Sequence, residues 1–282
     1  MNVDPCLAAY GLATALAIPP LLDGRLIVED SPRLRLTTWL LAGATVVGSW
    51  LAASVSLAHH DGPIAQSVGI LVGLLLVGRF AYALVVTRRD TYRSRRHHEA
   101  AARLVGRHDA KADVVMIESE ERIAYSIPRL RGGLVVVTTG AREALTDGEF
   151  RAVLAHERAH LSGRHHILIE IGQIFARALP GLRLFRDLRH RVPELLEMVA
   201  DDAAARRHGP RQVATAIASM STRPVPEATL GGGGPWAATR ALRLTVVTAG
   251  DRISSRVSLL ALAVVLAAAP FLMHLAACPH PW

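Results

Sequence analysis

Cysteine is almost absent from this chain: its 282 residues include only Cys6 and Cys278. This scarcity excludes a metal site built on Cys-x-x-Cys pairs. The topology argued below puts both thiols near the outer face of a membrane, where an oxidising environment permits a disulfide. The sequence leaves open whether the two form that bridge or stay unpaired.

Charge is missing from several long stretches. The hydrophobic fraction is 51% and the mean hydropathy is +0.28, high for a soluble protein. A helix of about 20 apolar residues crosses a bilayer core of ~30 Å. Four stretches are long enough: residues 5–22, 36–58, 64–86 and 257–277. The third contains only one charged residue, Arg79. We therefore expect four transmembrane helices.

Basic residues are also unevenly placed. The first stretch lacks a basic leading region, and its one early charge is Asp4, so we expect a retained span rather than a cleaved signal peptide. Residues 1–4, 59–63 and 278–282 contain no Lys or Arg, whereas arginines cluster on the other side of the spans. The positive-inside rule then predicts a plasma-membrane protein with both termini outside and a cytoplasmic segment from about Thr87 to Arg256.

The net charge of +8 and the pI of about 10.6 raise the question of nucleic acid. Much of the basic excess lies beside the spans, where topology and contact with anionic lipid headgroups account for it. Aromatic residues make up only 5% and do not alternate with the basic ones. We expect no direct nucleic-acid binding.

The cytoplasmic segment has the pattern of one α+β unit. Short β-branched runs predict strands at residues 112–119, 122–127 and 133–140. Thr146 and Glu149 form a capping box that begins a helix, for which Gly163 offers an end or a hinge.

Further helices are expected after that one. The apolar stretch at residues 167–182 carries Glu170 and Arg177, which favours a core or interfacial helix over a fifth span. Pro193 is typical of a first helical turn and predicts a helix start there. Another helix is expected from Gln212 to Ser221, before a glycine-rich break at residues 231–235.

The chemistry of the chain centres on "AHERAH", in which His156, Glu157 and His160 form the pattern H-E-x-x-H. On a helix the two histidines share a face and can bind one zinc ion, with the glutamate beside them as general base. Thirteen histidines in the chain make a chance match possible, so a third ligand is needed as independent support.

The stretch "LLEMVADDAA" supplies that ligand. A His₂Glu zinc site needs a glutamate from a second helix, and Glu197 fits this requirement. Asp201 lies four residues on, where it could accept the outer N–H of a ligand histidine and fix its tautomer. Two solvated carboxylates are the alternative, but the apolar neighbours indicate a mostly buried helix.

The run "GLVVVTTGAREALTDGEFRAVLAHERAH" followed by "EMVAD" resembles the gluzincin membrane metallopeptidases. Three spans before this domain and one after it resemble the BlaR/MecR-type sensor peptidases, whereas the related HtpX-like peptidases typically have two before and two after. The resemblance implies His156, His160 and Glu197 as zinc ligands, Glu157 as general base and Asp201 as the support of a ligand. In the sensor branch it also implies cleavage of a cytoplasmic winged-helix repressor.

The chain departs from these families at three places. Arg158 follows Glu157 where an aliphatic residue is usual, and His165 stands where the sensor branch often has Asp. Only "CPHPW" follows the last span, so the resemblance gives no penicillin-binding sensor domain and no β-lactam sensing. A separate sensor partner, or perception by the spans, is left open.

Two residues have weaker cases for a catalytic role. His208, just beyond the Glu197 helix, could stabilise the oxyanion of a tetrahedral intermediate or could be a cation favoured by the helix dipole. Tyr125 is a comparable candidate, and so is an edge strand around residues 123–127, to which an extended peptide could add.

We therefore expect an α-helical membrane protein with four transmembrane helices and an inserted cytoplasmic α+β gluzincin metallopeptidase domain. The expected divisions are residues 1–87, 88–256 and 257–282. The expected function is zinc-dependent endopeptidase signalling through a repressor. An HtpX-like quality-control protease and a catalytically silent membrane receptor or scaffold are the alternatives.

Overall fold

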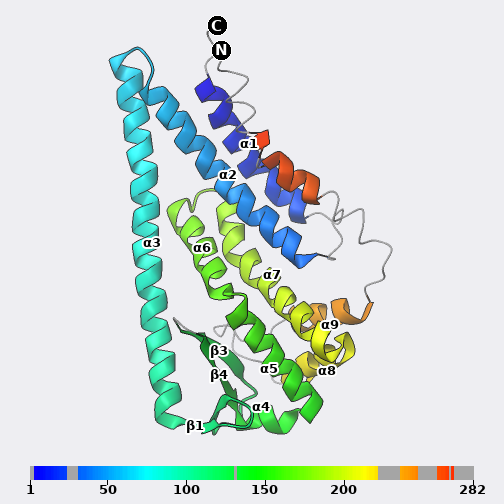
Figure 1. The fold of residues 1–282 in the computed structure, drawn as a ribbon. Coiled ribbons are helices and arrows are strands. Elements are labelled where there is room, and N and C mark those ends of the chain that lie inside the picture. The colour runs from blue at the N-terminus through cyan, green and yellow to red at the C-terminus, as the bar shows by residue number, and fades with distance from the viewer. Residues whose placement is uncertain are drawn as a thin grey trace. The chain divides into compact units, whose positions relative to one another are not determined.

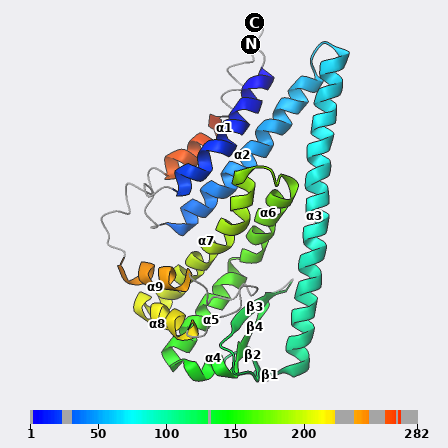
Figure 2. The same cartoon turned by 180° about the vertical axis from the view of Figure 1, so that it is seen from behind.

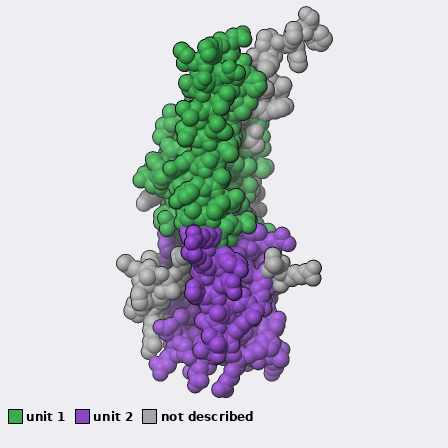
Figure 3. Space-filling view, turned by 90° about the vertical axis from the view of Figure 1, so that its left-hand side faces the viewer, with its two compact units in different colours: residues 1–88, 169–195, 249–282 green, residues 89–168, 196–248 purple. Residues whose placement is uncertain are grey.

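The computed structural model describes residues 3–23, 31–129, 132–221, 236–246, 259–266 and 268–269. Within these residues the chain is mostly helical and contains one small sheet (Figure 1). It divides into two compact units, which Figure 3 shows in different colours. The first unit comprises residues 1–88, 169–195 and 249–282, and the second comprises residues 89–168 and 196–248.

Among the described residues, three helices are long and apolar enough to cross a membrane, which indicates a membrane protein. They are α1 (Val3–Asp23), α2 (Pro32–Ala58) and α3 (Pro63–Val105), and they contain the first three predicted spans. Helices α1 and α2 pack along one another (Figure 2). Residues 259–266 are helical, but most of the remaining fourth predicted span lies outside the described residues, so that span stays a prediction.

Other parts of the first unit come from later in the chain. They are residues 169–195, drawn from α6 (His165–Ala178) and the first half of α7 (Arg183–His208). The ring of Phe175 on α6 lies 5.7 Å from that of Phe80 on α3 and 5.5 Å from that of Phe185 on α7. The predicted division of the chain at residues 88–256 stays a prediction.

Arg79, the charged residue inside the third predicted span, has a structural partner. Its Nε donates to the backbone carbonyl of Ala178 at 3.0 Å. Ala178 is the last residue of α6, where carbonyls have no partner within the helix, so the arginine satisfies one of them. The thiol of Cys6 is free and exposed, while Cys278 lies outside the described residues, so the possible disulfide remains untested.

The second unit is built on a four-stranded sheet in the order β1-β2-β4-β3. Strands β2 (Val114–Ile117), β3 (Ala124–Pro128) and β4 (Gly133–Thr138) confirm the three predicted runs. The β2–β4 pair is parallel, and β3 pairs with β4 antiparallel at one edge. Strand β1 (Gly106–Asp109) was not predicted, because "GRHD" is short, polar and without apolar alternation.

Side chains alternate across this sheet and bury different neighbours. Val135 and Val137 of β4 pack in one core cluster with residues of α5 (Asp147–Ser162). Val136 packs on the opposite face with Ala102 of α3. The remaining helices of this unit are α4 (Thr139–Ala144), α8 (Pro210–Met220) and α9 (Trp236–Val246). Helix α8 contacts both α5 and α9.

The predicted helix start at Pro193 is wrong, because α7 begins ten residues earlier at Arg183 and includes this proline. A proline inside a helix lacks the N–H that would bond to the carbonyl four residues before it. Leu188 and Val192, both with no exposed surface, pack this part of α7 in the core of the structure. Burial on one face therefore outweighs the missing hydrogen bond.

Candidate metal centre

Helix α5 begins where the sequence predicts. Oγ1 of Thr146 accepts the backbone N–H of Glu149 at 3.4 Å, and Oε2 of Glu149 accepts the N–H of Thr146 at 2.9 Å. This reciprocal capping box satisfies two N–H groups that a helix end leaves without partners. The H-E-x-x-H residues consequently lie in the second half of a well-defined helix.

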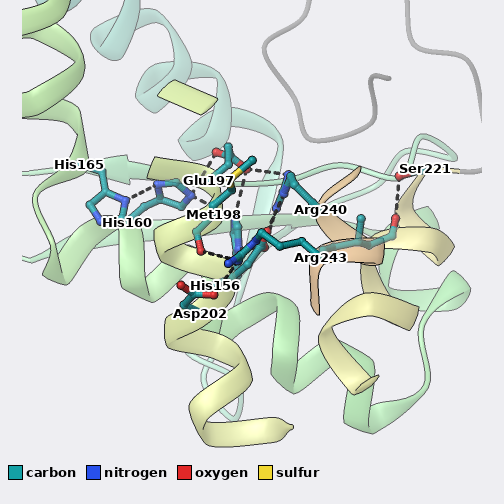
Figure 4. A network of polar contacts seen from close by, with 11 residues as sticks. His156, His160, His165, Glu197, Met198, Asp202, Ser221, Arg240 and Arg243 are labelled. Carbon is teal, nitrogen blue, oxygen red and sulfur yellow. Dashed lines mark hydrogen bonds and ion pairs between the residues drawn. The ribbon is translucent and has the colours of Figure 1, made fainter. Parts of the chain in front are cut away.

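Three side chains converge from two helices. His156 and His160 of α5 face one another with their Nε2 atoms 3.1 Å apart. Glu197 of α7 places Oε2 at 3.5 Å from Nε2 of His156 and Oε1 at 3.3 Å from Nε2 of His160. Figure 4 shows the three side chains directed toward one another.

This donor set fits a tetrahedral metal ion. One ligand atom from each of the three residues lies within 4.8 Å of the others. Ligands at 2.0–2.1 Å around a tetrahedral ion are separated by about 3.3 Å, close to the distances in this cluster. Two imidazoles and one carboxylate are also the ligands of a His₂Glu zinc site. The residues could therefore hold such an ion.

Asp201 lies behind the first histidine, as predicted. Its Oδ1 is 3.0 Å from Nδ1 of His156, and the carboxylate has no exposed surface. An acceptor at this position keeps a hydrogen of His156 on Nδ1, so the neutral ring would bind a metal through Nε2. Burial lowers the pKa of His156, but hydrogen bonds with Asp201 and Glu197 outweigh it and raise this pKa to about 10.

Glu157 lies between the two histidines in sequence and is buried. Burial raises the pKa of its carboxyl above the ordinary value, by more than the nearby His156 and His160 lower it. The nearby hydroxyl of Ser126 on the edge strand β3 lowers this pKa by less than burial raises it. A carboxyl group with a raised pKa is better suited to accept and release a proton than an ordinary glutamate.

His165 also belongs to the cluster, which sequence reasoning did not predict. Its Nδ1 lies 3.0 Å from Nδ1 of His160, and the residue is only 5% exposed. The chain turns between α5 and α6 at Gly163 and Arg164, and Arg164 has the unusual φ of 49°. This turn directs the first residue of α6 back to His160, which helical periodicity alone could not show. The only signal in the sequence was the family position five residues past His160.

Arg240 of α9 is the second residue that the sequence did not reveal. Its Nε and Nη2 each donate to Asp201 at 2.7 Å, and its Nη1 is 2.9 Å from Oε2 of Glu197. Burial raises the pKa of Asp201, but the contacts with Arg240 and His156 outweigh it and lower this pKa to about 2. The pKa of Glu197 is likewise held well below its ordinary value, against the effect of burial, by His156, His160 and Arg240.

The structure separates three other sequence candidates from the cluster. Arg158 donates to the carbonyl of Ala112 at 2.8 Å, so this departure from the family pattern leaves the ligands untouched. Tyr125 packs beside Ala102 on the sheet face away from α5, and this position gives no support to an oxyanion role. His208 ends α7 about 16 Å along the helix axis from Glu197, and this position gives no support to an oxyanion role.

The chain has a partial match to a known protein family. The model of peptidase family M48 matches residues 87–186, roughly a third of the chain. The matched segment includes the H-E-x-x-H residues and His165, and it ends before Glu197. The match supports an M48 metallopeptidase. No match was found among curated proteins or among solved structures.

Proposed function

We propose that this protein is an integral-membrane, zinc-dependent endopeptidase with its active site on the cytoplasmic side. The observation that carries the proposal is the convergence of His156, His160 and Glu197, with the buried Glu157 beside them. The family match over residues 87–186 supports the same class of enzyme. The cytoplasmic orientation rests on the arginines that flank the apolar helices.

The side chains divide the chemistry between them. Bound zinc would lower the pKa of a water molecule to about 7 and polarise the scissile carbonyl. His156, His160 and Glu197 would hold the ion, and Asp201 would keep His156 in the tautomer that binds through Nε2. Glu157 accepts a proton of the attacking water on its carboxylate and transfers it to the leaving amine.

An extended peptide is the substrate form that suits this site. Strand β3 is at the edge of the sheet, and its Ser126 lies close enough to Glu157 to affect the pKa of that carboxyl. A peptide that pairs with an edge strand has its backbone fixed by main-chain hydrogen bonds, while pockets select its side chains. Such pairing along β3 would bring a peptide bond close to Glu157.

The decisive experiment compares Glu157→Gln and Glu197→Ala in the purified full-length chain with zinc analysis and a protein substrate. Glu157→Gln should retain zinc and lose cleavage by at least a hundredfold, because the amide cannot accept the proton. Glu197→Ala should weaken zinc retention. Glu143→Gln, the same change at an exposed position, should alter neither property. Cleavage that survives Glu157→Gln would overturn the mechanism.

The cellular role we propose is signalling through one cytoplasmic target, a winged-helix repressor of the kind that BlaR/MecR-type peptidases cut. The test compares protein N-termini in cells carrying the wild-type chain or Glu157→Gln, with and without envelope stress. New ends confined to one small DNA-binding protein would support signalling. Fragments of many membrane proteins would instead indicate an HtpX-like quality-control protease, and unchanged ends would indicate a silent receptor or scaffold.

A further inference from the structure

One arginine connects both carboxylates of the cluster. All three nitrogens of the Arg240 guanidinium are used: Nε and Nη2 bind the two oxygens of Asp201, and Nη1 binds Glu197. The residue is 6% exposed, so water competes little for these contacts. A planar guanidinium with several donors in fixed directions constrains the geometry of its partners, which an ammonium group cannot do.

The contact with Glu197 restricts how that carboxylate can turn. Oε2 lies 2.9 Å from Nη1 of Arg240 and 3.5 Å from Nε2 of His156, while Oε1 lies 3.3 Å from Nε2 of His160. Nε and Nη2 of the same guanidinium fix the carboxylate of Asp201, which in turn orients the ring of His156. One arginine therefore acts on two of the three metal-binding side chains, directly on Glu197 and through Asp201 on His156.

The charges of the cluster give a second reason for this cation. Asp201 has no exposed surface, and Glu197, whose side chain is 36% exposed, lies one helical turn before it, so the two negative carboxylates are close together in a site where one of them is fully shielded from water. Two like charges in such a place repel each other strongly. Arg240 lies between them and offsets that repulsion whether or not an ion is bound.

A neighbouring arginine provides a natural comparison. Nη2 of Arg243, one turn further along α9, binds Oδ1 of Asp202 at 2.6 Å and the carbonyl of Met198 at 3.1 Å. Figure 4 shows both arginines reaching α7 from α9. Arg243 therefore joins the same two helices, but its hydrogen bonds avoid the three metal-binding residues and Asp201. Substituting Arg243 therefore tests the packing of α9 against α7, whereas substituting Arg240 also tests the positioning of the metal-binding side chains.

We propose that Arg240 is a positioning residue for the metal centre, which makes α9 part of the active site. Arg240 holds Glu197 and Asp201 in the arrangement that receives the ion, before the ion arrives. This inference rests on the proposed metallopeptidase function, since it assumes that these side chains bind a metal.

The test measures metal binding by the full-length protein in detergent, without relying on cleavage. The probes are Zn²⁺, in competition with a chromophoric chelator, and Co²⁺, whose visible absorption reports the ligand geometry. Arg240→Ala should weaken Zn²⁺ binding by about 10- to 100-fold, the usual effect of losing a group that supports a ligand. It should also change the Co²⁺ spectrum, whereas Arg243→Ala should leave both readouts close to wild type.

Arg240→Lys covers the case in which the alanine variant does not fold. Lysine keeps the positive charge but cannot contact both oxygens of Asp201 and Glu197 together. It should give an intermediate affinity and an altered Co²⁺ spectrum. Equal Zn²⁺ affinities for Arg240→Ala and Arg243→Ala, or a wild-type Co²⁺ spectrum in Arg240→Lys, would overturn the proposal.

The two proposals fail in different ways. If the wild-type chain binds Zn²⁺ but cleaves no peptide, the endopeptidase function is contradicted. Weaker Zn²⁺ binding by Arg240→Ala would still support the positioning role in that case. If the wild-type chain cleaves peptide and Arg240→Ala binds Zn²⁺ as tightly as Arg243→Ala does, only the positioning role is contradicted. A wild-type chain that binds no Zn²⁺ contradicts both.

Discussion

Nδ1 of His165 lies 3.0 Å from Nδ1 of His160, so the second histidine of H-E-x-x-H has a partner behind it just as His156 has Asp201. If His160 binds a metal through Nε2, its hydrogen is on Nδ1 and is donated to His165. The two ligands of α5 are thus supported by different groups, a carboxylate for one and an imidazole for the other.

We predict that His165→Ala weakens Zn²⁺ binding by about tenfold or more, because His160 loses the acceptor that fixes its ring. His165→Asp should retain most of the affinity, since a carboxylate is also an acceptor for Nδ1–H. Competition with a chelator measures both. An alanine variant with wild-type affinity would show that the contact has no role in binding.

Gly163 offers an independent test of the same contact. A Cβ at this position would lie 2.5 Å from Nε2 of His165 and 3.0 Å from the carbonyl of Ala159. Gly163→Ala should therefore displace the His165 ring and weaken Zn²⁺ binding in the same direction. If it acts through that ring, the change should add little in a His165→Ala background, and a double-mutant cycle measures this. Fully additive effects would contradict the explanation.

The protonation of His156 predicts how metal binding depends on pH. Its pKa is raised to about 10 in the metal-free protein, so the ring is protonated at pH 7, whereas a metal ligand must be neutral. Zn²⁺ binding at pH 7 should therefore release about one proton, and the apparent Kd should fall by about tenfold per pH unit as the pH rises toward that pKa.

Calorimetry in buffers of different ionisation enthalpy counts the released proton. Asp201→Asn is the informative variant, because it removes a carboxylate whose hydrogen bond raises the pKa of His156. This variant should release fewer protons on binding. Proton release that is the same in Asp201→Asn and wild type would refute the assignment to His156.

The capping box of α5 predicts a stability effect separate from metal binding. Thr146→Ala should lower the free energy of unfolding by about 1 kcal/mol, because the N–H of Glu149 loses its acceptor. Thr146→Ser, which keeps the hydroxyl, should restore most of it. Denaturant unfolding in detergent gives the difference, and the folded Thr146→Ala protein should bind Zn²⁺ like wild type. An alanine variant as stable as the serine variant would contradict this view of the cap.

Local patterns made much of this molecule predictable. The three strands followed from β-branched runs, and the start of α5 followed from Thr146 and Glu149, residues three apart. The residues of the metal cluster were also predictable, because His156 and His160 have helical spacing and so do Glu197 and Asp201. In each case the determining residues are neighbours in sequence, and backbone geometry brings them together.

The features that were missed depend on contacts between distant parts of the chain. Arg240 lies 39 residues beyond Asp201 in a chain with many arginines, and its spacing does not distinguish it from the others. Pro193 reads locally as a helix start, but burial of Leu188 and Val192 keeps the helix continuous through it. His165 needed the backbone turn at Arg164, whose φ of 49° is rare for a residue with a side chain.

The attachment of Arg240 to Asp201 also bears on how homologous genes should be judged. A gene truncated after Asp201 would still encode both H-E-x-x-H and E-x-x-A-D, and a motif search would count its product as an intact protease. That product would lack the guanidinium that holds two of its acidic side chains. If Arg240 has the proposed role, the residues that this metal site needs extend through α9, and a gene should be judged by Arg240 as well as by the two motifs.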